Sequence, residues 1–248
     1  MENLQLESLE RKISLIRDRV RGVAEGRTTG IYLHGRGGTS KSYTVETTLR
    51  SLRKPYKVSN SAMSAAGLFD TLRDAPDMIH VLDDMESILS AVAAHGVLRS
   101  ALWAVPNKDG RCDRLVTWKN RNKQDEFIFS GGIIMIANRP LPDRDTLQAL
   151  KTRIVVLEHT VTNEEVLALM RKMADGGVCF RGQHLSKEAC HEVVDAIRDG
   201  AEMLRRPMDI RLFVNGVADR LQSEAGSEND WRTLLESRIK ERTIDPRA

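Results

Sequence analysis

The sequence has few of the features that mark metal-binding, secreted or membrane proteins. Its three cysteines, Cys112, Cys179 and Cys190, are scattered. Neither a CxxC pair nor a histidine at ligand spacing accompanies them, so we interpret them as thiols without a metal or redox role. The longest apolar run, residues 132–137, is far too short to cross a bilayer. The chain opens with an amphipathic helical pattern in place of a secretion signal, so we expect a cytoplasmic protein with no membrane partner.

Charge and composition add few constraints. The chain of 248 residues has a net charge of +3, with 29% charged and 41% hydrophobic residues. So small a basic surplus permits nucleic-acid binding without demonstrating it. No repeat, low-complexity tract, zinc finger, winged-helix signature or nuclease motif is recognisable. We therefore expect specificity to come from loops, from the chain ends or from a partner protein.

Five short apolar runs, rich in β-branched residues, recur in the first two thirds of the chain. They do not alternate with polar residues, which is typical of strands buried on both faces of a parallel sheet. Helix-like or polar stretches separate them, so the pattern predicts a doubly wound α/β domain over residues 1–159 that begins with a helix at 1–25. The expected strands cover residues 31–34, 56–59, 78–82, 133–137 and 154–158.

Residues 160–248 have a different pattern, because the strand-like runs stop and helical periodicity takes over. Thr162 or Asn163 is a suitable helix cap, and Glu164 and Glu165 follow in the first turn. Three further segments have similar periodicity. We expect a small, all-helical second domain of about four helices.

A glycine-rich turn, "GRGGTSKS", joins the first expected strand to a helix. Phosphate binding requires that context, because glycines let backbone N–H groups converge on a phosphate and the helix N-terminus adds its positive end. In this interpretation Lys41 reaches the β- and γ-phosphate oxygens of ATP and Ser42 coordinates Mg²⁺. The usual motif has glycine where this chain has Ser40, at a cost of roughly 1 kcal/mol if the serine φ is positive. The expected phosphate-binding residues are Gly35, Gly37, Gly38, Thr39, Ser40, Lys41 and Ser42.

Two aspartates end the third expected strand, at the sheet edge where the glycine-rich turn also lies. We expect Asp83 to hold Mg²⁺ together with Ser42, and Asp84 to orient or deprotonate the attacking water. Glu86 is the alternative base, because Asp84 is one methylene shorter than the usual glutamate. The competing interpretation is that both aspartates are solvated and cap the next helix.

With these two motifs the chain resembles the AAA+ ATPases over nearly its whole length. "GRGGTSKS" is similar to the family's phosphate loop, and "VLDD" to its Walker B strand. "IIMIAN" resembles the sensor 1 strand, which implies that Asn138 contacts the attacking water or the γ-phosphate. "LQALKTRI" resembles the segment that ends in the arginine finger, here Arg153, and "RRPMDIRLFVNGV" resembles the sensor 2 helix, with Arg211. Either arginine has a simpler interpretation as a surface or salt-bridged residue.

The resemblance implies a fold, cofactors and an assembly. The fold would be a five-stranded P-loop core at 1–159 with a helical lid domain at 160–248. The cofactors would be ATP and Mg²⁺. The assembly would be a homo-oligomer, expected as a hexameric ring or a filament, in which Arg153 serves the ATP of a neighbouring subunit.

Residues 111–130 have the outline of a β-hairpin, with two β-prone runs around a polar tip. Their position resembles the pre-sensor-1 hairpin of one AAA+ branch. The tip carries Lys119, Arg121 and Lys123, which suit a phosphate backbone, and DNA is the expected polymer in preference to RNA. Trp118 could stack on a base or pack on the sheet, and the tip could simply be solvated.

The sequence is compatible with three functions. The first is a nucleic-acid motor, helicase or loader in replication or mobile-element DNA processing. The second is a protein-remodelling ATPase. The third is a slow, nucleotide-gated assembly switch, which Ser40 and Asp84 make plausible.

Overall fold

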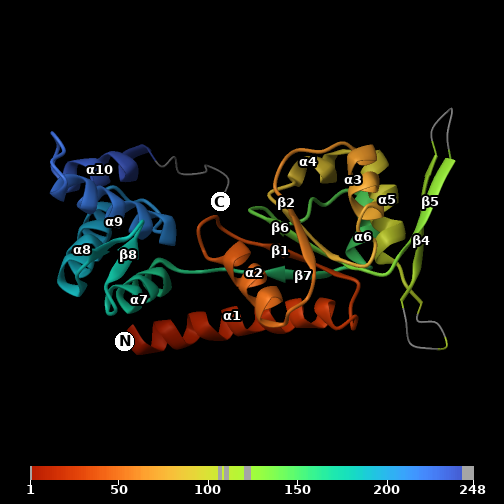
Figure 1. Ribbon diagram of the computed structural model, residues 1–248, viewed down its shortest axis with the longest axis horizontal. Helices are drawn as coiled ribbons and strands as arrows, with labels where there is room; N and C mark the ends of the chain where they lie inside the picture. The colour runs from red at the N-terminus through yellow and green to blue at the C-terminus, as the bar shows by residue number, and fades with distance from the viewer. Residues whose placement is uncertain (1, 106–107, 109–111, 120–123, 242–248) are drawn as a thin grey trace. The chain divides into compact units, whose positions relative to one another are not determined.

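The computed structural model describes residues 2–105, 108, 112–119 and 124–241 (Figure 1). The chain divides into two compact units. The sheet unit comprises Lys12–Arg36 and Ser40–Thr160, and the helical unit comprises Met1–Arg11, Gly37–Thr39 and Val161–Ala248. The first helix and the glycine-rich turn therefore contribute residues to both units.

The sheet unit is built on five strands in the order β2-β3-β6-β1-β7, and every neighbouring pair is parallel. The expected α/β class and the five-stranded parallel sheet are thereby confirmed, with strand ends within about one residue of the predicted ones. The strands are β1 (Gly30–His34), β2 (Tyr56–Ser59), β3 (Ile79–Asp83), β6 (Gly132–Ala137) and β7 (Val155–Glu158).

Helices cover both faces of this sheet (Figure 1). Successive side chains of a strand point to opposite faces. Tyr32 of β1 therefore packs in the apolar cluster that includes α3, α4, α5 and α6, whereas Ile31 and Leu33 pack with α1 and α2. Burial on both faces explains why the strands are continuously apolar. The helices are α1 (Glu2–Ala24), α2 (Lys41–Ser51), α3 (Ala65–Arg73), α4 (Glu86–Ser90), α5 (Val92–Leu102) and α6 (Asp145–Lys151).

The segment after Asp84 forms two helices, although the sequence pattern reads as one. Ala91, between α4 and α5, has an extended backbone with φ −91° and ψ 104°. The break lies two residues after Leu89 and interrupts the regular helical hydrogen bonding there. Nε2 of buried His95 lies 2.8 Å from the carbonyl oxygen of Leu89. A buried histidine thus provides a partner for a carbonyl that the break would otherwise leave unpaired.

An antiparallel hairpin of β4 (Arg114–Lys119) and β5 (Gln124–Phe129) precedes β6, within the region where the sequence suggested one. Its inner face is aromatic and packs on α3. The ring of Phe69 in α3 lies 6.2 Å from that of Trp118 and 5.1 Å from that of Phe127. This packing corresponds to the simpler interpretation of Trp118.

Arg114 anchors the base of the hairpin from a buried position. Its Nε donates to the carbonyl of Phe129 at 3.2 Å, and another guanidinium nitrogen donates to the carbonyl of Gly131. The guanidinium carbon lies 4.8 Å from the centre of the Phe129 ring. Burial lowers the pKa of Arg114 to about 10, so the side chain remains a cation at neutral pH.

The helical unit contains α7 to α10 and, contrary to the all-helical expectation, a short hairpin. Strands β8 and β9 pair antiparallel around Arg181 and Gly182, whose φ values are 49° and 82°. Two successive residues with positive φ are what a tight hairpin turn requires, and the glycine supplies one of them without strain. The elements are α7 (Asn163–Ala174), β8 (Val178–Phe180), β9 (Gln183–Leu185), α8 (Lys187–Met203), α9 (Ile210–Glu224) and α10 (Trp231–Glu241).

Two polar features order the helices of this unit. Thr162 is the N-cap of α7, and it forms a reciprocal capping box with Glu165. Asp219 of α9 is almost fully buried and accepts two hydrogen bonds from Arg238 of α10, at 2.6 and 2.7 Å. Such a bidentate pair fixes the register of α10 against α9.

Candidate functional site

The turn between β1 and α2 has a backbone that favours glycine. Gly35 has φ 152°, and a Cβ there would lie 2.2 Å from the carbonyl oxygen of His159. Gly38 has φ 71°, and a Cβ there would lie 2.5 Å from the side chain of Asp209, a residue of the same helical unit. Ser40 also has a left-handed backbone, with φ 69° and ψ 14°. The serine therefore occupies a conformation that glycine adopts without strain, as the motif comparison anticipated.

Lys41 opens α2 with its ammonium group turned into the glycine-rich turn. The side chain is 5% exposed. Its Nζ donates to the carbonyl oxygens of Gly35 at 2.6 Å and Arg36 at 2.8 Å, and lies 3.4 Å from Oδ1 of Asn138. A cation is thus held beside the N-terminus of a helix, where backbone N–H groups also carry positive charge.

Asp83, at the end of β3, lies next to Ser42 of α2. The Ser42 hydroxyl hydrogen-bonds to the Asp83 carboxylate, and Lys41 is close enough to favour its charge. Burial is the larger effect and raises the pKa of Asp83, and the negative charge of Asp84 raises it further. A carboxylate and a hydroxyl in contact are oxygen donors of the kind that Mg²⁺ prefers, so this pair fits that ion.

Asn138 connects the lysine to two candidate bases. It directly follows β6, and its Nδ2 donates to Oδ1 of Asp84 at 3.1 Å. Its backbone N–H donates to Oε1 of Glu86 at 3.3 Å. Asp84 itself has φ 52°, and its N–H donates to the carbonyl of Ile136 at 3.0 Å. Lys41, Asn138 and the two acids therefore form one polar network at the carboxyl ends of β1, β3 and β6.

Arg153 lies away from this network. It precedes β7, whose register pairs Val155 with Ile31 and Glu158 with His34. Five residues of extended chain separate Arg153 from Glu158, or about 16 Å along the strand direction. Within its own sheet unit, Arg153 therefore lies near the amino ends of the strands, whereas Lys41 lies near their carboxyl ends.

Arg211 is exposed in the first turn of α9. The N-cap of this helix, Asp209, accepts from the N–H of Leu212 at 3.0 Å. The N–H of Ile210 donates to the carbonyl of Gly38 at 3.0 Å. Within the helical unit, the residue before Arg211 thus contacts the glycine-rich turn.

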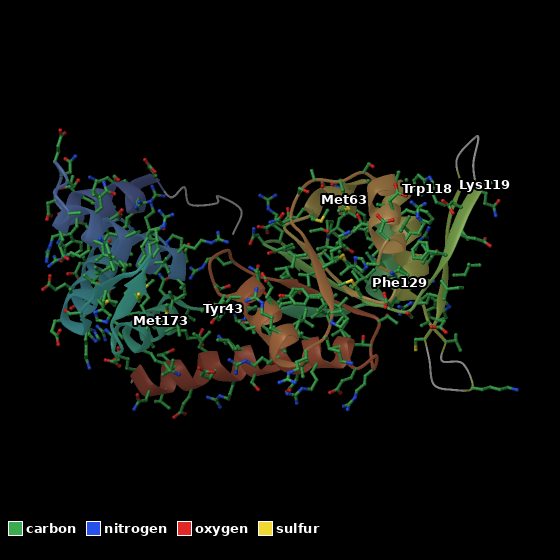
Figure 2. The ribbon with its side chains drawn as sticks, viewed as in Figure 1. Tyr43, Met63, Trp118, Lys119, Phe129 and Met173 are labelled. Atoms are coloured by element: carbon green, nitrogen blue, oxygen red, sulfur yellow. The ribbon has the colours of Figure 1, made fainter. Side chains whose placement is uncertain are left out.

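The basic hairpin tip is described only in part. Lys119 is exposed at the end of β4 (Figure 2). Arg121 and Lys123 lie outside the described residues. Trp118 is half-buried against α3, so its indole is engaged within the protein.

Two residues near the site were not found by sequence reasoning. His34 ends β1 next to Gly35, and burial lowers its pKa, with Lys41 contributing in the same direction and Glu158 opposing. A histidine that closes an otherwise apolar strand is the signal that could have identified it. Tyr43 follows Ser42, and its ring is 72% exposed at the start of α2 (Figure 2).

The described part of the chain contains no group of three or more His, Cys, Asp or Glu residues placed to hold a metal ion. Among the described residues, no helix combines the length and the apolar character needed to cross a membrane. Comparison with family models and with curated proteins returned no match.

Proposed function

We propose that this protein is a Mg²⁺-dependent ATPase of the AAA+ type that works as an oligomeric ring or filament. The observation that carries the proposal is the convergence of Lys41, Asp84 and Asn138 behind a glycine-rich strand-to-helix turn. They meet at the carboxyl edge of a parallel sheet, the place where α/β proteins bind nucleotides. An isolated glycine-rich turn would not provide this set of side chains.

The residues of the turn have separate tasks in this proposal. The backbone N–H groups of residues 35–42 surround the β-phosphate, and Lys41 exchanges its carbonyl partners for the β- and γ-phosphate oxygens. Ser42 and Asp83 hold Mg²⁺, which when bound neutralises charge on these oxygens. Burial raises the pKa of Asp83, and the Ser42 hydroxyl and the Lys41 charge act in the opposite direction.

Asp84 is the residue that we assign to the attacking water, as orienter or base. Asn138 holds the Asp84 carboxylate by its side-chain amide and contacts Glu86 by its backbone, so it sets the positions of both acids. Lys41 reaches the same asparagine. A γ-phosphate bound by Lys41 would therefore lie beside the group that positions the water.

The assembly and the polymer involve residues outside the glycine-rich turn. We propose that Arg153 acts on the ATP of a neighbouring copy, and that Arg211 serves as the sensor 2 arginine that the family resemblance implies. DNA is the proposed polymer because the hairpin tip carries Lys119, Arg121 and Lys123. Trp118 does not support this choice, since its ring is packed on Phe69.

A slow assembly switch is the second candidate, and a specific observation favours it. Ser40 has a left-handed backbone next to Lys41, and Asp84 has one next to the water position. Strain at both places is compatible with a site that binds ATP and hydrolyses it rarely.

Steady-state hydrolysis separates these functions. The rate is measured with and without Mg²⁺ and with single-stranded or double-stranded DNA at several salt concentrations, together with the assembly mass. A DNA motor should hydrolyse ATP faster with DNA, and the stimulation should fall steeply with salt. A switch should show ATP-dependent assembly with turnover below roughly 1 per second. Absence of both hydrolysis and ATP-dependent assembly would reject the proposal.

A further inference from the structure

Trp103, immediately after α5, is an unusually exposed tryptophan. Its side chain is 57% accessible, and Val105, two residues on, is 69% accessible. Tryptophan is normally among the most buried residue types on average, and exposed tryptophan and arginine dominate the energetic centres of protein interfaces. The indole therefore forms an exposed apolar surface on the sheet unit, of the kind that binds another protein surface.

Arg153 lies against this indole. The guanidinium carbon is 5.2 Å from the centre of the Trp103 ring, and Nη1 donates to the carbonyl of Ala149 at 2.8 Å. Nε is buried and has no hydrogen-bond partner within the described residues. Two contacts thus restrain a long side chain that would otherwise sample many rotamers, while part of its hydrogen-bonding capacity stays unused.

The geometry places this arginine where its own site cannot use it. Arg153 lies at the start of β7, and Lys41 lies beyond the opposite end of the neighbouring strand β1. Under the proposed function Arg153 contacts a nucleotide phosphate, and because it lies far from Lys41 along the strand direction, that phosphate belongs to another copy of the chain. The exposed Trp103 beside it would be covered by that copy.

We propose that Trp103 is a positioning residue: its indole holds the Arg153 guanidinium in the orientation that a neighbouring copy's ATP requires. This inference rests on the proposed function. Trp103 lies outside the motifs, and the occupant of its exposed surface is a second copy of this chain. Arg153 touches the phosphate, and Trp103 acts through it.

A complementation assay tests the proposal. Lys41→Ala chains keep Arg153 but lack the phosphate lysine, and Arg153→Ala chains keep the lysine but lack the arginine. Each should be inactive alone, and a mixture should recover hydrolysis, because the first chain supplies its arginine to the second. The test chain is Lys41→Ala combined with Trp103→Ala, mixed with Arg153→Ala under the same conditions.

We expect the recovered rate to fall about three- to thirtyfold when Trp103 is replaced by alanine in the arginine-donating chain, the range that loss of a cation–π contact predicts. Trp103→Phe in the same chain should restore most of the rate, because a phenyl ring keeps the stacking face. Val92→Ala, at an exposed apolar site at the start of α5, is the matched control and should leave the rate unchanged. The free energy of unfolding and the assembly mass are measured for every mixture.

The outcomes distinguish failure of the proposed ATPase function from failure of the positioning role of Trp103. If the original mixture recovers no hydrolysis although the wild type is active, the shared site is rejected, and with it the positioning role. If the wild type shows neither hydrolysis nor ATP-dependent assembly, the proposed function itself fails. If the mixture recovers equally with and without Trp103, the shared site stands and the positioning role is overturned. Loss of assembly in the Trp103→Ala mixture would agree with a second copy as the occupant of the Trp103 surface but would overturn the positioning role, because the indole would then act by joining the copies.

Discussion

Replacing Ser40 by glycine should stabilise the protein, although the substitution removes a side chain. Ser40 has φ 69° and ψ 14°, and its hydroxyl does not cap α2. A left-handed backbone costs an L-residue about 1–2 kcal/mol. Glycine removes that strain but gives the unfolded chain more freedom, which costs about 0.4–1 kcal/mol. The difference is a gain of about 0–1.6 kcal/mol in the free energy of unfolding, with a central value of about 0.8 kcal/mol.

Urea unfolding of three variants measures this gain. Ser40→Gly should be more stable than the wild type, whereas Ser40→Ala keeps the strained Cβ and should lie within about 0.5 kcal/mol of it. Arg53→Gly is the matched control, because exposed Arg53 has φ 53° at the far end of α2. It should gain stability by the same mechanism without any change in ATP hydrolysis. If Ser40→Gly is no more stable than Ser40→Ala, the strain argument is wrong.

Ser40→Gly also tests whether the backbone conformation of residue 40 limits the rate of ATP hydrolysis. If the serine slows the site, Ser40→Gly should hydrolyse ATP faster than the wild type at saturating ATP, and Arg53→Gly should not. Equal turnover in all three proteins would show that the loop residue does not set the rate, and would remove one support for the slow-switch function.

Three further predictions concern the base, the hairpin and a buried histidine. Asp84→Asn should lower turnover by about 10²- to 10⁴-fold with little change in ATP affinity, and a larger loss in Glu86→Gln would transfer the role of base to Glu86. Phe69→Ala should lower the free energy of unfolding by about 3–5 kcal/mol, because the ring is 2% exposed and joins α3 to the hairpin; a loss below about 1 kcal/mol would contradict this packing. Burial lowers the pKa of His80 below its ordinary value of 6.5, so the unfolded chain binds this proton more readily than the folded protein. Above pH 6.5 the histidine should not reduce the free energy of unfolding, and below that pH the free energy of unfolding should fall. His80→Gln should reduce this pH dependence in denaturation experiments, and an unchanged slope would assign it to other groups.

The sheet could be predicted from the sequence because its strands are buried on both faces. Continuous apolar runs such as residues 133–137 are typical of strands covered by helices on both faces, and their length of about five residues favours a strand over a helix. Asp83 ends β3, and Asn138 directly follows β6, so both residues lie at the carboxyl ends of parallel strands. The network that joins Asn138 to Lys41 follows from parallel pairing, which brings the carboxyl ends of the strands together.

Other features depended on contacts that no local pattern encodes. The short hairpin around Arg181 and Gly182 interrupts a region whose periodicity is otherwise helical. The packing of Trp118 depends on Phe69, which is 49 residues earlier in the chain. The stacking of Arg153 on Trp103 joins two segments 50 residues apart. Sequence reasoning could give each aromatic side chain a buried or an exposed role, but tertiary packing decided between them.

The most direct test of the central claim is the affinity of the glycine-rich turn for MgATP, measured by titration calorimetry on the wild type and on Lys41→Ala. The account predicts that the wild type binds MgATP with a dissociation constant in the micromolar range, about −8 kcal/mol. Loss of the charge-assisted contacts should weaken binding by about 30-fold or more in Lys41→Ala. The free energy of unfolding without nucleotide is measured for both proteins, because Lys41 is buried and bonds to two carbonyls of the turn. Equal affinity in the two proteins, or no binding to the wild type, would contradict the claim that this turn holds a triphosphate.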